Sequence, residues 1–187
     1  MKITTTNKVL DYHDFVDFSP LFIETGSCAG DGIQRALNAG FLRVKSVESM
    51  MEYYLICVER FKGKLIQLYF GSSIEMLPEM ISQLNYPAVF FLDAHPAGPG
   101  TAGHDEILAG DGNFGQDHII TEELKVILAH RKDHLIIIDD LDFGSKEDAN
   151  YMAMCLKVNP KYTFEYYDEK LPQTELRKNK VLVCKPN

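Results

Sequence analysis

Short apolar segments recur along this chain and alternate with stretches in which the apolar residues are spaced three and four apart. The strand-like segments cover residues 21–25, 43–48, 64–70, 87–93 and 134–140. The stretches between them have helical spacing, as at Ile33, Ala36 and Leu37. Segment 87–93 is almost continuously apolar, which is typical of a central parallel strand covered on both faces. The pattern predicts repeated strand-helix-strand units and a mainly parallel sheet, an α/β fold.

The two ends of the chain have patterns of their own. Residues 161–168 and 180–184 read as two strands with no room for a helix between them, so we expect an antiparallel hairpin at one edge of the sheet. Residues 1–18 are predicted to form a lead-in helix or arm that packs on the domain. The prediction is therefore a single domain over residues 1–187, with a seven-stranded, mostly parallel sheet and helices on both faces.

Composition and charge narrow the classes of protein to which this chain could belong. The chain is 45% hydrophobic and 25% charged, which is ordinary globular composition. The net charge of -8 argues against a general phosphate-binding surface, so we expect no nucleic-acid partner. The four cysteines lie far apart with no C-x-x-C pair, which predicts reduced thiols and a cytoplasmic location. No apolar run approaches the ~18 residues of a membrane span, so we expect neither a signal peptide nor a membrane anchor.

A glycine-rich turn at residues 26–32 joins the first predicted strand to the first predicted helix. Glycine backbones reach positive φ and let a ligand approach closely, and a helix start directs unpaired N–H groups at the same place. The turn therefore indicates a site for a nucleotide or an adenosine-containing cofactor. The alternative is an ordinary strand-to-helix turn that binds nothing.

Acidic residues stand at the ends of four of the predicted strands. They are Glu24, Glu48, Asp93 and the pair Asp139 and Asp140. In an open parallel sheet the ligand lies beyond these ends. Glu48 follows Gly26 by 22 positions (48 − 26), close to the spacing of about 20 at which an acidic side chain accepts hydrogen bonds from ribose hydroxyls. Otherwise Glu48 is a solvated or helix-capping carboxylate.

The aspartates at the later strand ends indicate a possible metal site. If Asp93, Asp139 and Asp140 lie close together, they repel one another unless a cation or a shared proton relieves them. Their hard oxygen atoms suit Mg²⁺. Asp139 and Asp140 are adjacent, so they can share an ion only where the strand breaks into a loop, as residues 141–144 indicate. Alternatively, one of them caps the following helix and the other lies in water.

Histidines and a long loop surround these aspartates in the sequence. His95, two residues beyond Asp93, is a candidate general base, a further metal ligand or a surface residue. His104 and His118 have weaker claims to the same roles. Residues 94–117 are rich in glycine and predict a long loop, either a lid that closes over a substrate or a disordered segment.

These motifs resemble those of the class I S-adenosylmethionine-dependent methyltransferases over nearly the whole chain. The segments that carry the resemblance are 22–32, 46–48, 70–72 and 91–95, together with the closing hairpin. The resemblance implies a Rossmann-like fold with a C-terminal antiparallel hairpin strand, and S-adenosylmethionine as the cofactor. The residues that it implies for cofactor binding are Glu24, Gly26, Ser27, Gly30, Glu48, Ser72 and Asp93.

The pairing of segment 92–95 with segment 138–140 is more specifically similar to the metal-dependent O-methyltransferases, such as the macrocin-type sugar enzymes and, more distantly, catechol O-methyltransferase. That resemblance implies Mg²⁺ held by Asp93, Asp139 and Asp140. Two positions depart from the family pattern. Cys28 stands at the centre of the glycine turn and fits there if its φ is negative, and His95 stands where the sugar enzymes tend to have a second acid.

The sequence thus predicts a methyltransferase that acts on a hydroxyl group of a small molecule, of sugar or natural-product type. The metal would hold the substrate oxygen, and Asp93 and His95 are the predicted catalytic residues. Because the lead-in is short, the loop or the second subunit of a homodimer would cover the site. The alternative function is a methyltransferase-like module that binds an adenosine ligand without catalysis. An NAD-dependent dehydrogenase shares the turn and Glu48 but is disfavoured by the hairpin and the strand-end aspartates.

Overall fold

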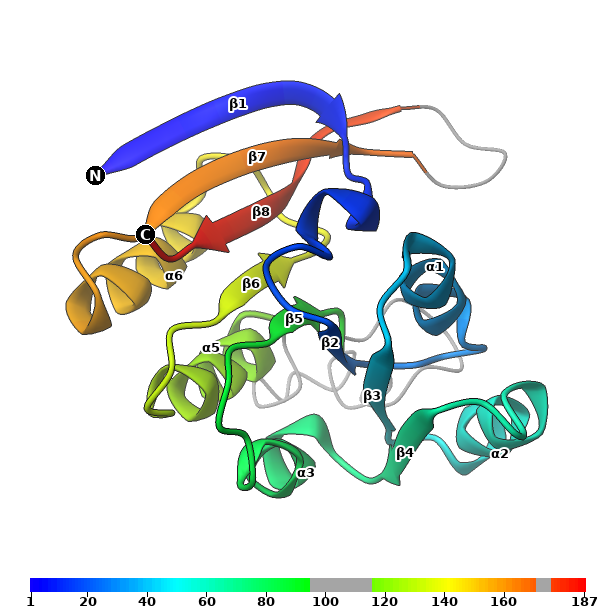
Figure 1. Ribbon diagram of the computed structural model, residues 1–187. Coiled ribbons are helices and arrows are strands. Elements are labelled where there is room, and N and C mark those ends of the chain that lie inside the picture. The colour runs from blue at the N-terminus through cyan, green and yellow to red at the C-terminus, as the bar shows by residue number, and fades with distance from the viewer. Residues whose placement is uncertain (95–115, 171–175) are drawn as a thin grey trace, which may run out of the picture.

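The computed structural model describes residues 1–94, 116–170 and 176–187, and these residues form an eight-stranded sheet flanked by helices (Figure 1). The strand order is β1-β7-β8-β6-β5-β2-β3-β4. The strands are β1 (Lys2–Val9), β2 (Leu21–Thr25), β3 (Arg43–Glu48), β4 (Ile66–Phe70), β5 (Val89–Leu92), β6 (Leu135–Ile138), β7 (Thr163–Glu169) and β8 (Arg177–Lys185). The helices are the 3₁₀ helix η1 (Tyr12–Phe15), α1 (Asp31–Ala39), α2 (Met51–Arg60), α3 (Ser73–Ile81), α5 (Gln116–Leu128) and α6 (Lys146–Val158).

The direction of the strands agrees with the predicted α/β architecture. Strands β2, β3, β4, β5 and β6 pair in parallel, and β8 is antiparallel to both β6 and β7. The chain runs outward from β2 to β4 and then returns to add β5 on the other side of β2. The order therefore reverses between β2 and β5, and in such a sheet the crevice at the carboxyl ends of these two strands is where a ligand binds.

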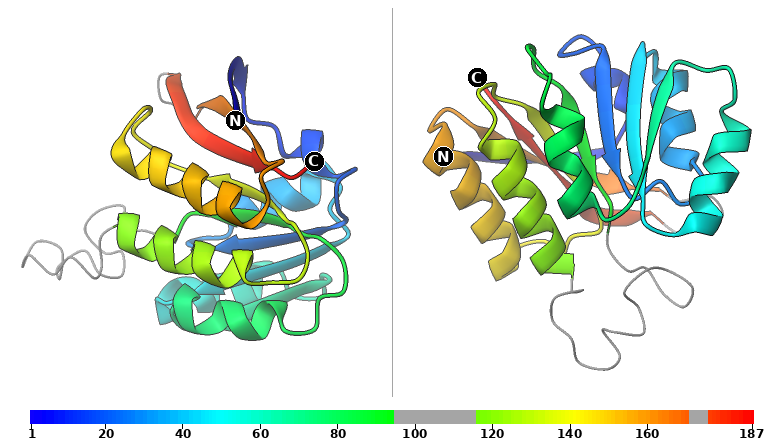
Figure 2. Two further views of the ribbon diagram at one scale, coloured as in Figure 1. Left: turned by 90° about the vertical axis from the view of Figure 1, so that its left-hand side faces the viewer. Right: turned by 90° about the horizontal axis from the view of Figure 1, so that it is seen from below.

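Two apolar layers enclose the sheet, because side chains alternate between the faces of each strand. One layer joins Ile23 and Phe90 to Leu77 of α3, Leu124 of α5 and Tyr151 of α6. Figure 2 shows these three helices side by side on one face. The opposite layer joins buried side chains of the strands to η1, α1 and α2, and includes Tyr12, Phe22, Ile33, Cys57 and Phe91. Each face of the central strands is thus covered, as the continuous apolar run of β5 predicts.

The edge of the sheet differs from the prediction. Residues 2–9 form β1, which pairs in parallel with β7 from Lys2 opposite Thr163, so the lead-in is a strand followed by a 3₁₀ helix. The sheet has eight strands where seven were predicted, and β1 takes the edge position expected for the hairpin. The physical reason is that β1 is held by backbone hydrogen bonds and carries little apolar surface, since almost all of its residues are exposed.

Most predicted boundaries lie close to those observed. Helix α6 spans Lys146–Val158, the predicted range, whereas α5 begins at Gln116 and so includes the end of the predicted loop. The rest of that loop, residues 95–115, lies outside the described residues together with His95 and His104. Among the helices that the structure describes, none is both long and apolar enough to cross a membrane.

A pair of histidines, the buried His134 and the half-buried His130, links the start of β6 to the segment before β5. His134 Nδ1 accepts a hydrogen bond from the Ala88 N–H at 3.0 Å, and His130 Nε2 lies 3.2 Å from the Leu84 carbonyl oxygen, which can only accept. His130 Nδ1 is therefore an acceptor, and His134 Nε2 donates to it across 2.8 Å. A proton on His134 Nδ1 would face the Ala88 N–H. Burial, followed by the charge of His130, lowers the pKa of His134 to about 4.

This pair predicts a loss of stability in acid. Between about pH 6.5 and pH 4 the unfolded chain binds a proton at His134 and the folded chain does not, so the free energy of unfolding falls as the pH falls. The full effect is on the order of 3 kcal/mol. His134→Asn keeps an acceptor for Ala88 and does not titrate, so urea unfolding of this variant should lack that part of the pH dependence.

Wild type must be compared with His134→Asn because two buried carboxyl groups change the free energy of unfolding with pH in the opposite direction. Burial raises the pKa of Glu24 to about 8 and that of Asp139 to about 7. The folded chain keeps these protons where the unfolded chain releases them, so their contribution to stability falls as the pH rises from about 4 to 8. If wild type and His134→Asn show the same pH dependence between pH 4 and 6.5, His134 does not stay neutral in the folded chain.

Candidate functional site

The glycine turn between β2 and α1 lies against the neighbouring strands. Gly26 has φ +80° and Gly30, the N-cap of α1, has φ +88°. The N–H groups of Gly26 and Ser27 donate to the Val47 carbonyl of β3 at 3.0 and 3.1 Å. On the other side, a Cβ at Gly26 would lie 2.5 Å from the Asp93 carbonyl oxygen. The turn is therefore packed between the carboxyl ends of β3 and β5.

Cys28 at the centre of the turn corrects one prediction. Its φ is +45°, in the left-handed region, whereas a Cys was expected to fit there with a negative φ. A non-glycine residue in this region costs roughly 1–2 kcal/mol. The strain is retained because the Cys28 N–H donates to Glu48 Oε2 at 2.8 Å and its carbonyl accepts from the Cys57 thiol at 3.2 Å.

Glu48, at the end of β3, holds two segments of backbone at once. Its Oε2 accepts from Cys28, and its Oε1 accepts from the Met50 N–H at 2.8 Å. The Gly71 N–H donates to the Glu48 carbonyl, which brings the end of β4 beside it. Each carboxylate oxygen has two lone pairs, so both oxygens can accept a further hydrogen bond from a ligand hydroxyl. Glu48 is 7% exposed and lies at the edge where the sequence predicted a ribose-binding acid.

Glu24 lies beneath the turn and not on its surface. The side chain is 1% exposed, and the Ser46 hydroxyl donates to its Oε2 at 2.6 Å. The Ser27 hydroxyl lies 2.6 Å from that of Ser46, so the turn is linked to this carboxyl group through side chains. A Cβ at Gly32 would overlap Glu24 Oε1, which means that this carboxyl group also packs against the start of α1. Burial raises the pKa of Glu24 to about 8, while the Ser46 hydrogen bond acts in the opposite direction.

Asp93 and Asp139 lie side by side at the ends of β5 and β6. The Asp93 N–H donates to the Thr25 carbonyl and the Asp139 N–H to the Leu92 carbonyl, both at 3.2 Å, so the two residues extend adjacent ladders. Burial, and then the charge of Asp93, raises the pKa of Asp139 to about 7. A carboxyl group that titrates near neutrality beside a second carboxylate is suited to accept a proton.

Asp140 has a different environment from the one that the metal prediction requires. It has φ +57°, and its carboxylate forms an ion pair with Arg177 Nη1 at 2.7 Å. Arg177 also pairs with Glu169, so it links the turn end of the hairpin to the end of β6. In the part of the chain that the structure describes, no three His, Cys, Asp or Glu side chains form a group that could hold a metal ion. The arrangement therefore does not match the predicted convergence of Asp93, Asp139 and Asp140 on Mg²⁺, because Asp140 is already paired with a cation.

The other residues that the sequence predicted for the site are Ser72 and three histidines. Ser72 is the N-cap of α3, but its side chain makes no capping hydrogen bond. It follows β4 and so lies at the same edge of the sheet as Glu48. His118 is half-buried in α5. His95 and His104 lie outside the described residues.

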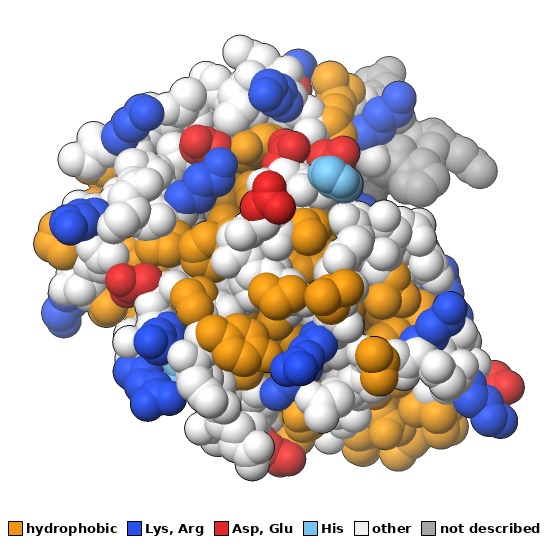
Figure 3. All heavy atoms as spheres, viewed as in Figure 1, with side chains coloured by type: hydrophobic (Ala, Val, Ile, Leu, Met, Phe, Trp, Pro, Cys, Tyr) orange, Lys and Arg blue, Asp and Glu red, His pale blue; other side chains and the backbone are white. Residues whose placement is uncertain are grey.

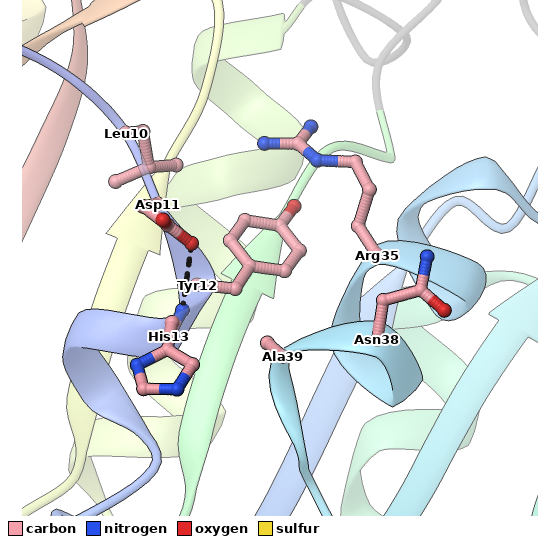
Figure 4. Close-up of a pocket in the computed structure, with 7 residues that line it drawn as sticks. All are labelled: Leu10, Asp11, Tyr12, His13, Arg35, Asn38 and Ala39. Carbon is pink, nitrogen blue, oxygen red and sulfur yellow. Dashed lines mark hydrogen bonds between the residues drawn. The ribbon is translucent and has the colours of Figure 1, made fainter.

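Sequence reasoning missed Tyr12 and Arg35, which flank a cavity of about 360 Å³ between η1 and α1 (Figure 4). The Tyr12 ring packs between Phe22 and Phe91, with centroid distances of 5.0 and 5.3 Å, and the Arg35 guanidinium lies over it at 4.3 Å. One feature of the sequence could have indicated Tyr12. It is an aromatic residue with a polar hydroxyl group, and it lies three residues before the apolar Phe15 in the lead-in.

The surface around η1 carries mixed charge. Figure 3 shows Asp and Glu side chains gathered over η1 and β7, with a His beside them, while Lys and Arg side chains are scattered singly around this face. A cationic ligand would therefore meet a favourable local charge on this side of the molecule.

Comparison with known proteins gives the following result. No family model and no curated protein matches the sequence. Among solved structures, human methyltransferase-like protein 13 in complex with SAH has a TM-score of 0.54 and 11% identity, covering 96% of this chain and 77% of that one. A candidate methyltransferase from Streptococcus mutans, also with SAH, has a TM-score of 0.55 and 12% identity, with 92% and 93% covered. A candidate O-methyltransferase from Klebsiella pneumoniae has a TM-score of 0.54 and 14% identity, with 94% and 78% covered.

These identities are low, so the comparison concerns the fold. The similarity extends over most of both chains, and this chain has a mostly parallel sheet with an antiparallel β8. The chain therefore has the Rossmann-like fold of the class I S-adenosylmethionine-dependent methyltransferases.

Proposed function

We propose that this protein is an S-adenosylmethionine-dependent methyltransferase that methylates a hydroxyl group of a small molecule of sugar or natural-product type. The observation that supports this most strongly is the position of the Glu48 carboxylate. It lies at the carboxyl end of β3, is hydrogen-bonded to the glycine turn through Cys28 and retains acceptor capacity. This is the arrangement expected for an acid that accepts hydrogen bonds from ribose hydroxyls.

The residues around the turn suit the rest of such a cofactor. The backbone of residues 26–32 can approach an adenosine ligand because Gly26 and Gly30 have positive φ and carry no side chain. Asp93 supplies negative charge just beyond the end of β5, which favours a cationic sulfonium. Bound S-adenosylmethionine would supply an electrophilic methyl group, and the protein would position the acceptor and remove its proton.

The proton of the acceptor hydroxyl needs a base at the same edge. Asp93 and His95 are the proposed catalytic residues. Asp139 is a further candidate because its pKa is raised to about 7 beside Asp93. In the proposed reaction the acceptor oxygen forms a bond to the methyl carbon, the bond from that carbon to sulfur breaks, and the hydroxyl proton passes to the base.

Magnesium assistance, a homodimer and a cytoplasmic location remain predictions of the sequence. The ion pair between Asp140 and Arg177 does not favour a three-carboxylate metal site, so no step of the proposed reaction is assigned to a metal. A small-molecule acceptor remains the proposed partner.

Calorimetric titration tests the cofactor assignment. We expect the protein to bind S-adenosylhomocysteine and to show no heat with NAD, and each titration is repeated with and without Mg²⁺. Binding of NAD alone would favour a dehydrogenase. The non-catalytic module is a second candidate, and it predicts S-adenosylhomocysteine binding with no formation of S-adenosylhomocysteine from S-adenosylmethionine across a panel of sugars and phenols.

A further inference from the structure

Tyr12 has a buried hydroxyl group that the fold does not satisfy. The residue is 2% exposed, and its Oη has no hydrogen-bond partner within the described ranges. Leaving a buried hydroxyl unpaired costs about 1–3 kcal/mol. The ring itself is held by Phe22 and Phe91, for which a phenylalanine would serve equally well. The hydroxyl therefore has no evident role in the ligand-free fold.

The hydroxyl lies between charges of opposite sign. Burial raises its pKa well above the usual value; the charge of Arg35 lowers this pKa, and those of Glu24, Asp139 and Asp93 raise it further. The group is therefore a neutral O–H donor that lies close enough to a guanidinium and to strand-end carboxyl groups to feel their charges. Figure 4 shows the hydroxyl pointing toward the Arg35 guanidinium, above β5.

The position of Tyr12 relates it to the proposed cofactor site. Its ring contacts Phe22 of β2 and Phe91 of β5, the strands between which the order of the sheet reverses. Glu24 lies two residues after Phe22 in β2 and so on the same face as the ring, and Asp93 lies two residues after Phe91, just past the end of β5. Arg35 makes no hydrogen bond or ion pair to any other described residue and borders the cavity, so its side chain is available to a ligand.

We infer that Tyr12 and Arg35 bind the carboxylate of the aminoacyl end of the sulfonium cofactor. This inference rests on the proposed function. The aminoacyl end carries a carboxylate, an ammonium and a neighbouring sulfonium. The O–H and guanidinium groups match the carboxylate, and the nearby Asp93 could attract the two cations.

The test compares two adenosine ligands that differ only at the aminoacyl end. S-adenosylhomocysteine has the aminoacyl group, whereas 5′-methylthioadenosine has a methyl group in its place. In calorimetric titrations, Tyr12→Phe and Arg35→Gln should each bind S-adenosylhomocysteine about 10- to 100-fold more weakly, as expected for hydrogen bonds to a charged group. Both variants should bind 5′-methylthioadenosine as wild type does. Without ligand, Tyr12→Phe should melt at the same or a higher temperature, because it removes an unpaired buried hydroxyl.

A matched control is Tyr167→Phe, which removes a hydroxyl of β7 that donates to Glu165 at 2.9 Å and should leave both affinities unchanged. The inference is overturned if Tyr12→Phe binds S-adenosylhomocysteine as wild type does, or if it loses affinity for both ligands equally. If wild-type protein binds neither ligand, the proposed function fails and this inference fails with it. If wild type binds both ligands with the same affinity, only the inference fails.

Discussion

Gly26→Ala should destabilise the protein by about 2 to 4 kcal/mol and abolish measurable binding of S-adenosylhomocysteine. The new Cβ would lie 2.5 Å from the Asp93 carbonyl oxygen and 2.9 Å from the Ala94 Cα, and both are backbone atoms that cannot rotate away. A φ of +80° adds the roughly 1–2 kcal/mol of a left-handed non-glycine residue. Relief of the close backbone contacts and of the strain at φ +80° would push the turn away from β5. Urea unfolding measures the loss of stability.

Gly63→Ala separates the loss of stability caused by backbone strain from the loss caused by the close contact with β5. Gly63 has φ +78°, almost the same as Gly26, but a Cβ there would meet nothing within 4 Å. This variant should lose only the roughly 1–2 kcal/mol of backbone strain and should bind S-adenosylhomocysteine normally. If the two variants lose the same stability, the close approach of the turn to β5 is not what Gly26 provides.

Glu48→Ala should weaken S-adenosylhomocysteine binding by roughly 10- to 100-fold, equivalent to about 1–3 kcal/mol. Two effects combine. The ligand hydroxyls lose their acceptor, and the N–H groups of Cys28 and Met50 lose theirs, so the turn is held to β3 only by the hydrogen bonds from Gly26 and Ser27 to Val47. Because the second effect acts without ligand, the melting temperature should fall as well. Glu48→Gln keeps one acceptor oxygen and should show an intermediate loss.

Glu52→Ala is the matched control, since Glu52 is an exposed residue in the first turn of α2, close in sequence to Glu48. It should change neither affinity nor melting temperature by a measurable amount. A folded Glu48→Ala protein with unchanged affinity would falsify the ribose assignment and with it the main support for the proposed cofactor.

Elements with a strong apolar pattern were predictable from the sequence. Strand β5 is buried along its whole length, as its unbroken apolar run indicates, and α6 has the predicted bounds. Strand β1 was missed because it has almost no buried face, so the alternation that reveals a strand is absent. Its partner β7 begins at Thr163, and no local pattern identifies a partner that distant.

The sequence indicated where the backbone of the site residues lies better than it indicated the partners of their side chains, and the roles of these residues stay predictions. The acids at the strand ends are where parallel pairing places them, because that edge follows from strand direction alone. The sequence could not indicate that Asp140 would have φ +57° and pair with Arg177, since this depends on how the hairpin packs against β6. For the same reason it could not predict the positive φ of Cys28, which is retained by the hydrogen bond to Glu48.

The pairing of β1 with β7 has a consequence for the order of folding. Lys2 lies opposite Thr163, so this ladder closes a loop of nearly the whole chain and can form only after the rest of the sheet has brought its ends together. During synthesis, β1 and the adjoining η1 wait for β7 to emerge from the ribosome. Tyr12, which directly follows this strand, would then reach its place over β2 and β5 last. We expect hydrogen exchange during refolding to protect β2, β5 and β6 before β1, with the Tyr12 segment completing the site after the sheet is built.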